Sequence, residues 1–176
     1  EDVVFSINRA KSDDSNMKEL LNSIVEVRAA GDYTVEFVTN GPNPILSANL
    51  TNLFMMDKDW TEENDTVKVQ DTDGGEVTFA TTNAMGTGPY QLVSREPDVR
   101  TVLSAYDGYW GKDMFPLDVT EIIYTPIQNA ATRVAALLSG EVDIVQDVPV
   151  QDIQRLEQTE GLKVEFGPEN RTIFFA

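Results

Sequence analysis

Patterns of apolar and polar residues predict two β-hairpins along the chain. In residues 24–38, apolar side chains alternate with charged or polar ones on both sides of a turn at 30–32. This period of two residues is typical of a half-buried antiparallel strand. A second hairpin is expected to join residues 90–94 to 99–105, because Glu96-Pro97-Asp98 between them is a strong turn signal.

Apolar residues spaced by three and four positions predict short helices in the first part of the chain. Asp2 is expected to cap a helix whose apolar face runs to Ala10, and residues 17–23 form a second short helix. A third helix is expected to begin near Pro44, since proline suits the first helical turn. Its inward side chains are expected to be Ile45, Leu46, Leu50 and Leu53.

The acidic stretch from residue 57 to 75 interrupts these patterns. Its sequence, DKDWTEENDTVKVQDTDGG, is polar, and we interpret it as polar chain with a short strand at 67–69. Another short strand is expected at 77–79, where the chain becomes apolar again.

The clearest pattern lies in the last third of the chain. A strand is expected at 119–127, a helix capped by Asn129 and stopped by Gly140, and a second strand at 142–148. Strand, helix and strand in this order predict a right-handed βαβ unit. The buried helix face is expected to consist of Ala131, Val134, Ala135 and Leu138.

Two further elements are expected beyond this unit. A helix begins in residues 149–158, and alternating apolar residues predict another strand at 162–166. The chain is therefore a mixed α/β protein.

Composition excludes several classes of function. The 176 residues include 13 Lys and Arg, 30 Asp and Glu, and neither His nor Cys, which gives a net charge of −17. Without His or Cys there is no Ser-His-Asp triad, thiolate nucleophile or Cys- or His-ligated metal. The negative charge argues against nucleic acid and anionic membranes as partners, and no apolar run is long enough for membrane insertion.

Candidate motifs for chemistry are weak. Gly86-x-Gly88 lacks the third glycine of a dinucleotide-binding loop, because position 91 is Gln. A calcium loop starting at Asp71 would need Gly at position 76, which is Glu. Carboxylate pairs could serve a glycosidase, and aromatic residues could stack on a ligand, but such pairs arise by chance among 30 acids and aromatics usually fill cores. The sequence favours a binding module over an enzyme.

Five segments of the sequence carry specific motifs. They are EDVVFSI with Arg9, DYTV through GPNP (residues 32–44), GTGPY (86–90), YDGYWG (106–111) and ATRVAALLSGEVDI (131–144). In this order they resemble a known family, the extracellular solute-binding proteins of family 5 that serve peptide-type ABC importers. The family has two lobes of the type II periplasmic-binding-protein kind and an inserted extra domain. Since its members are about three times longer, the resemblance implies an internal part of a larger protein.

The resemblance also implies a division of the chain and a ligand cleft. Residues 1–82 would cover the end of the inserted domain and its return segment, residues 83–148 part of the first ligand-binding lobe, and residues 149–176 the start of the passage to the second lobe. The residues expected near the cleft are Gly86, Gly88, Gln146, Asp147 and Pro149. No catalytic residue, metal site or cofactor is expected, and the family's main ligand contacts would lie in the second lobe.

The function implied is capture of a small solute, a dipeptide or oligopeptide, and its delivery to the permease subunits of an ABC importer. Related alternatives are a nickel chelate, haem or an oligosaccharide as ligand. Alternatives of another class are a carboxylate-dependent hydrolase domain and an acidic interaction module. The location implied is periplasmic or extracellular, with a lipid anchor in a Gram-positive bacterium. The piece itself is expected to be monomeric or to associate only artefactually.

Overall fold

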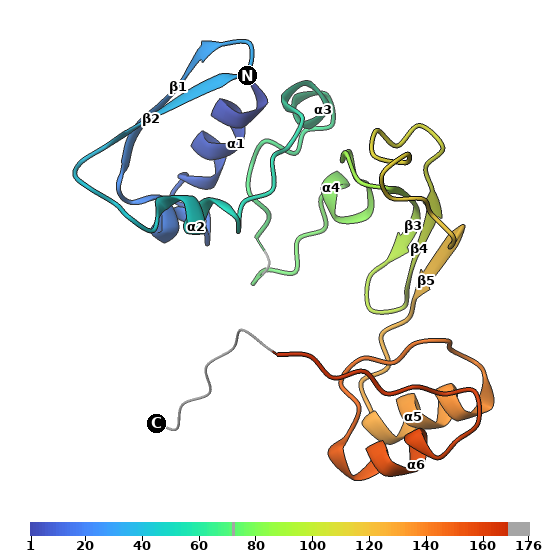
Figure 1. Ribbon diagram of the computed structural model, residues 1–176. Coiled ribbons are helices and arrows are strands. Elements are labelled where there is room, and N and C mark those ends of the chain that lie inside the picture. Colours follow the sequence, from blue (N-terminus) through green and yellow to red (C-terminus); the bar gives the residue numbers. More distant parts are fainter. Residues whose placement is uncertain (72, 169–176) are drawn as a thin grey trace. The chain divides into compact units, whose positions relative to one another are not determined.

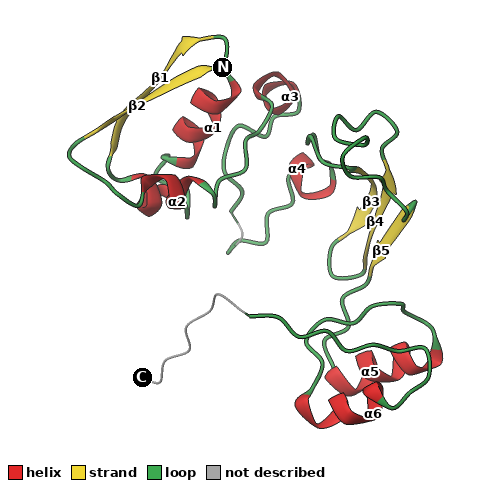
Figure 2. Ribbon diagram, in the orientation of Figure 1, coloured by secondary structure: helices red, strands yellow, loops and turns green. Residues whose placement is uncertain are grey.

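The computed structural model describes residues 1–71 and 73–168. The chain divides after Thr125 into two compact units (Figure 1). Helices and strands are mixed in the first unit (Figure 2), which confirms the mixed fold class expected from the sequence.

The first unit begins with a helix packed on a hairpin. Helix α1 (Asp2–Ala10) and strand β1 (Ile24–Gly31) contribute to one core, and β1 pairs antiparallel with β2 (Thr34–Thr39). Gly31 pairs with Thr34, so the turn lies one to two residues later than the sequence indicated. The buried side chains of this core are Ile7, Leu21, Ile24 and Val27.

Two short helical segments complete this core. A 3₁₀ helix, η1 (Lys18–Leu21), replaces the helix expected at 17–23, and α2 (Leu46–Leu50) follows the hairpin. Leu46, Leu50 and Leu53 pack on the core as expected. Ile45 was expected to point inward too, but it precedes α2 and is 60% exposed, so that prediction is wrong.

The acidic stretch contains a helix that the sequence did not reveal. Helix α3 (Lys58–Glu63) starts at Asp57, whose Oδ1 accepts a hydrogen bond from the amide of Trp60 at 2.7 Å. Such a cap satisfies an amide that the first turn leaves free. Residues 67–69 form no strand, and the strand expected at 77–79 is also absent. Helix α4 (Phe79–Thr82) stands there instead.

The start of α1 differs by one residue from the expectation. Glu1, and not Asp2, occupies the cap position of α1. The carboxylate of Asp2 instead accepts a hydrogen bond from the amide of Lys58 at 3.1 Å, which connects α1 to the first residue of α3.

A three-stranded antiparallel sheet forms the rest of the first unit. Its order is β3 (Tyr90–Glu96), β4 (Arg100–Ala105) and β5 (Glu121–Tyr124). The β3–β4 hairpin confirms the second predicted hairpin, and Asp98 in its turn has a φ of 61°. Strand β5 is shorter than the expected 119–127 and pairs with β4.

The second unit is built on helix α5 (Ala130–Ser139). Asn129 caps it by accepting a hydrogen bond from the amide of Thr132 at 3.0 Å, and Gly140 ends it in the left-handed conformation at φ 75°. Both signals were expected, and both are confirmed. Glycine suits the left-handed position because it has no Cβ.

The buried face of α5 differs from the expected one. Val134 and Ala136 are the buried residues, Leu138 is half-buried, and Ala131 and Ala135 are exposed. The prediction was therefore correct for Val134 and wrong for the two alanines. Alanine is small and only weakly apolar, so the apolar pattern alone does not decide which alanines of the helix face the core.

The strands expected in this unit are absent. Residues 142–148 and 162–166 form no ladder with any strand among the described residues, so no βαβ unit is formed. A strand requires a hydrogen-bonded neighbour, which an apolar sequence alone cannot supply. The helix expected in 149–158 is confirmed as a 3₁₀ turn, η2 (Val150–Asp152), followed by α6 (Ile153–Glu157).

Candidate functional site

The five residues expected near a ligand cleft fall into two groups. Gly86 and Gly88 belong to the first unit, and Gln146, Asp147 and Pro149 belong to the second. Each group belongs to the surface of its own unit.

The glycine-rich segment 86–90 is held against the aromatic segment 106–111. The indole Nε1 of Trp110 donates to the carbonyl oxygen of Thr87 at 3.1 Å. Nearby, the amide of Tyr106 donates to the carbonyl of Pro89 at 2.9 Å. Two sequence motifs that are separate in the chain therefore meet at one end of the β3–β4 hairpin.

The two glycines of this segment lie open on the surface. Gly86 and Gly88 are exposed, neither has a positive φ, and a Cβ added at either would meet no atom within 4 Å. Neither glycine is therefore required here by a left-handed turn or by a close approach of another described residue. Without side chains, Gly86 and Gly88 leave the backbone on either side of Thr87, to which Trp110 is bonded, exposed to solvent.

Trp110 is a large, exposed aromatic side chain next to the glycine-rich segment. It is 71% exposed, and its ring lies 5.4 Å from that of Tyr109, centre to centre, at an angle of 58°. The Thr87 hydrogen bond fixes the indole edge, so that its position is defined despite the exposure. An exposed aromatic ring held in this way can stack on a planar or apolar group of a ligand.

In the second unit, Arg133 determines the course of the segment that carries Gln146 and Asp147. Its Nη2 donates to the carbonyl oxygen of Asp147 at 3.1 Å, and its Nη1 donates to the carbonyls of Ile127 and Gln128 at 2.7 and 2.9 Å. One guanidinium thus connects the chain before α5 to the chain after it. No local pattern in the sequence indicated this role of Arg133.

Asp147 has a backbone conformation that is rare for a residue with a side chain. Its φ is 59°, in the left-handed region, where Asp and Asn are the most tolerated non-glycine residues. Gln146 and Asp147 are exposed, and Pro149 is half-buried at the start of η2. The left-handed residue turns the chain sharply between the segment after α5 and η2.

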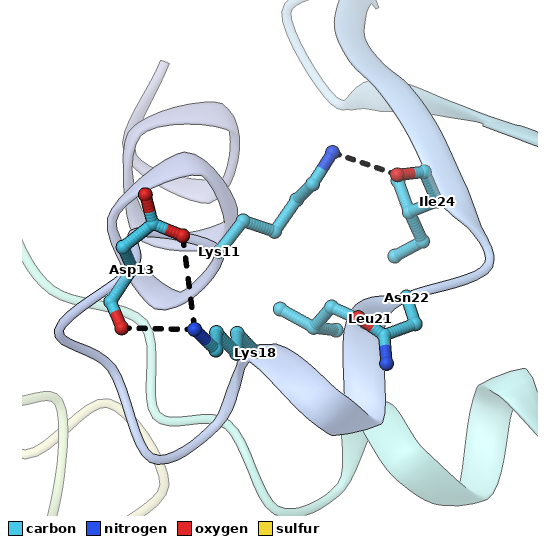
Figure 3. A pocket seen from close by; sticks show the side chains of 6 residues that line it. All are labelled: Lys11, Asp13, Lys18, Leu21, Asn22 and Ile24. Carbon is cyan, nitrogen blue, oxygen red and sulfur yellow. Dashed lines mark hydrogen bonds and ion pairs between the residues drawn. The ribbon is translucent and has the colours of Figure 1, made fainter.

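Two cavities lie elsewhere in the first unit. The first, about 320 Å³, lies along the connection from the end of α1 through η1 to the start of β1 and is lined by the six residues shown in Figure 3. Lys11 Nζ donates to the carbonyl of Ile24 at 2.7 Å, and Lys18 Nζ donates to the carbonyl of Asp13 at 3.0 Å. Both ammonium groups therefore bind backbone oxygens of this chain and connect neighbouring segments of it.

The second cavity, about 380 Å³, lies beside Arg9. Arg9 donates hydrogen bonds to the carbonyls of Thr66, Val67 and Lys68 at 2.9–3.3 Å. These bonds hold segment 66–68, which has no regular secondary structure, against α1. Burial lowers the pKa of the Arg9 guanidinium, since removal from water disfavours the charged form. Neither cavity includes any of the five residues predicted for the cleft.

No group of three or more Asp or Glu side chains gathers within residues 1–71 and 73–168 in a way that could hold a metal ion. Among those same residues, no helix has the length and apolar character that crossing a membrane requires.

Comparison with known proteins gives a consistent result. A family model described as "Bacterial extracellular solute-binding proteins, family 5 Middle" matches residues 1–176. The dipeptide-binding protein of Escherichia coli strain K12 is 25% identical over 93% of this chain and 32% of its own length. The nickel-binding protein NikA of Staphylococcus aureus is 32% identical over 72% of this chain and 22% of its own length.

Solved structures show the same fold. A nickel ABC transporter protein of Bacillus halodurans superposes with a TM-score of 0.66 at 29% identity, over 91% of this chain and 30% of that one. The periplasmic binding protein DppA of Helicobacter pylori, in complex with the peptide STSA, gives a TM-score of 0.70 at 24% identity, over 90% and 32%. The chain spans between about a fifth and a third of the length of these relatives and structures.

Proposed function

Because this chain belongs to the bacterial extracellular solute-binding proteins of family 5, we propose that it is part of a longer binding protein that captures a dipeptide or oligopeptide for an ABC importer. The observation that carries the proposal is the match of the family model to residues 1–176. It is supported by the similarity, over most of this chain, to a dipeptide-binding protein and to a peptide-bound structure.

A nickel chelate is the second candidate ligand. It is favoured by the relative named as nickel-binding and by the nickel transporter structure. This chain has neither His nor Cys, so its own contribution to such a ligand would come from oxygen atoms or from contacts to the organic part of the chelate.

The cleft residues form part of the proposal. Gln146, Asp147 and Pro149 lie on one turn, and Gly86 and Gly88 lie beside the exposed ring of Trp110. Exposed polar groups on a fixed turn and a positioned aromatic ring are features that ligand sites use. The division into residues 1–82, 83–148 and 149–176 remains a prediction, and the break in packing after Thr125 falls within its middle segment.

The proposal includes partners and a place of action. The longer protein would act outside the cytoplasmic membrane, as its family name states, and would deliver its ligand to permease subunits of the importer. A lipid anchor in a Gram-positive bacterium remains a prediction. We propose that the protein has no catalytic activity, since this chain has no His or Cys to act as a nucleophile or base.

Binding measurements on two proteins test the proposal. Calorimetric titration of this chain and of the full-length protein with the same dipeptides and tripeptides should show at least about tenfold weaker binding to the chain. A two-lobed clamp binds from both walls, and each charge-assisted hydrogen bond lost is worth about 1.5–3 kcal/mol. Equal affinities would place the whole site within residues 1–176.

Ligand identity is tested separately. Native mass spectrometry of the full-length protein purified from its host should show a co-purified peptide. A nickel-containing adduct would select the second candidate, and binding of neither class by either method would overturn the proposed function.

A further inference from the structure

Asn40 and Gly41 form the one Asn-Gly pair among the eleven asparagines of the sequence, and they lie directly after β2. An asparagine followed by glycine is the most reactive pair for spontaneous deamidation, because no side chain on the second residue hinders attack by its backbone nitrogen. We propose that Asn40 is a site of spontaneous modification, at which the side-chain amide is converted to aspartate and isoaspartate.

The structure leaves the Asn40 side chain free to react. Among the described residues, seven asparagines have side chains held by hydrogen bonds. These are Asn22, Asn43, Asn49, Asn52, Asn64, Asn83 and Asn129. Within the same part of the chain, only Asn8, Asn16 and Asn40 make no side-chain hydrogen bond. Asn40 is exposed, so its side chain can rotate toward the following peptide unit.

The attacking nitrogen distinguishes Asn40 from the other two free asparagines. Asn8 lies inside α1, where the helix fixes the nitrogen of the next residue. The nitrogen after Asn16, that of Met17, donates to Ser15 Oγ at 3.1 Å. The Gly41 nitrogen makes no hydrogen bond to any residue in 1–71 or 73–168, and a Cβ added at Gly41 would meet no atom within 4 Å.

The chemistry needs only water as co-reactant. The Gly41 nitrogen, after losing its proton to solvent, attacks Cγ of Asn40 and forms a new C–N bond. The side-chain nitrogen takes up a proton from solvent, its bond to Cγ breaks, and it leaves as ammonia. Water then opens the resulting succinimide ring at either carbonyl. Opening at one carbonyl gives an ordinary aspartate, and opening at the other gives isoaspartate, in which the main chain runs through the former side-chain carbon.

The location gives the reaction a structural consequence. The Asn40 amide donates to the carbonyl of Ser23 at 2.9 Å, just beyond the pair Ile24 and Thr39 at the open end of the hairpin. Asn43 Nδ2 donates to Ser23 Oγ at 2.7 Å in the same place. The extra backbone carbon of isoaspartate shifts residue 40 out of register with Ser23. Either product also adds a negative charge to a chain that already has −17.

Ageing of the purified chain tests this inference. The protein is incubated in mildly alkaline buffer, and fragment spectra of the tryptic peptide that spans residues 29–58 locate any amide-to-acid mass change. We expect conversion at Asn40 well ahead of Asn43, Asn49 and Asn52 in the same peptide, which serve as internal controls. Labelling by an isoaspartate-specific methyltransferase should rise in parallel, and faster at higher pH.

Gly41→Ala is the matched variant. The φ of Gly41 is not in the left-handed region and the added Cβ has space, so the fold should be retained while the methyl group hinders the attack. We expect loss of the fast conversion in this variant, and also in Asn40→Gln, which keeps Gly41 and provides the same test if the alanine variant fails to fold. The inference is overturned if Asn40 is no faster than its neighbours, or if Gly41→Ala converts at the parental rate.

Discussion

Nη2 of Arg133 donates to the backbone carbonyl of Asp147 at 3.1 Å, and this bond connects helix α5 to a turn that lies fourteen residues further along the chain. The same guanidinium holds two carbonyls on the other side of α5. Asp147 has a left-handed backbone conformation, which is costly unless neighbouring contacts hold it. The course of the exposed turn with Gln146 and Asp147 therefore depends on a side chain of α5.

Arg133→Ala should destabilise the second unit by about 1.5–3 kcal/mol, the usual range for hydrogen bonds that involve a charged group. Arg133→Lys should rescue only part of the loss, because an ammonium lacks the planar fork that reaches carbonyls on both sides. Hydrogen exchange of the α5 amides measures the effect. Arg155→Lys, an exposed change on α6, is the control, and an equal effect of both lysine variants would contradict the assigned role.

Leu21→Ala should cost about 2–5 kcal/mol, since Leu21 is fully buried in the core under α1 and the hairpin. Ile45→Ala, a change of comparable size at a residue that is 60% exposed, should cost much less. Urea denaturation of the first unit measures both. Similar losses would show that Ile45 is as buried as the sequence pattern indicated.

Ala136→Asp should unfold or severely destabilise α5, because it places an unpaired carboxylate on the buried face. Ala135→Asp, one position earlier and on the exposed side, should change the melting temperature little. Thermal melting followed by circular dichroism compares this adjacent pair. If Ala135→Asp proves the more damaging, the helix faces are assigned incorrectly.

The Asp2 carboxylate should contribute to stability above about pH 4 and lose that contribution in more acidic solution. The amide of Lys58 donates to it and lowers the pKa of Asp2 below its usual value of 3.8, since the bond favours the charged form. A lowered folded-state pKa gives stability that is fully present above the unfolded-state pKa and disappears as pH falls through the folded-state value.

Unfolding of the parent and of Asp2→Asn across this pH range measures the effect. The difference between them should be largest near neutral pH and shrink in acid. Asp32→Asn, which removes the same charge from the exposed turn between β1 and β2, is the control, and a matching pH dependence there would assign the effect to net charge alone.

Local signals in the sequence determined several elements of this protein. The two hairpins were predicted because alternation and turn residues act over a few neighbouring positions, as at Asp98. The limits of α5 were predicted because Asn129 and Gly140 satisfy helix ends within one turn. The family resemblance also came from the sequence, since its motifs are contiguous runs of residues, and the match over residues 1–176 confirms it.

Other features depended on contacts between residues far apart in the sequence. Helix α3 was not predicted because the acidic stretch that contains it is polar. The ring of its Trp60 packs against that of Phe79, with the ring centres 5.7 Å apart. Residues 142–148 are apolar enough for a strand, yet a strand exists only where a neighbour completes its hydrogen bonds. Arg133 also donates a hydrogen bond to the carbonyl of Asp147, and Trp110 donates one to the carbonyl of Thr87. No local sequence pattern predicts these bonds, because the partners are far apart in the chain. Tertiary packing alone decided these relationships, because their energies arise only after the chain has brought the partners together.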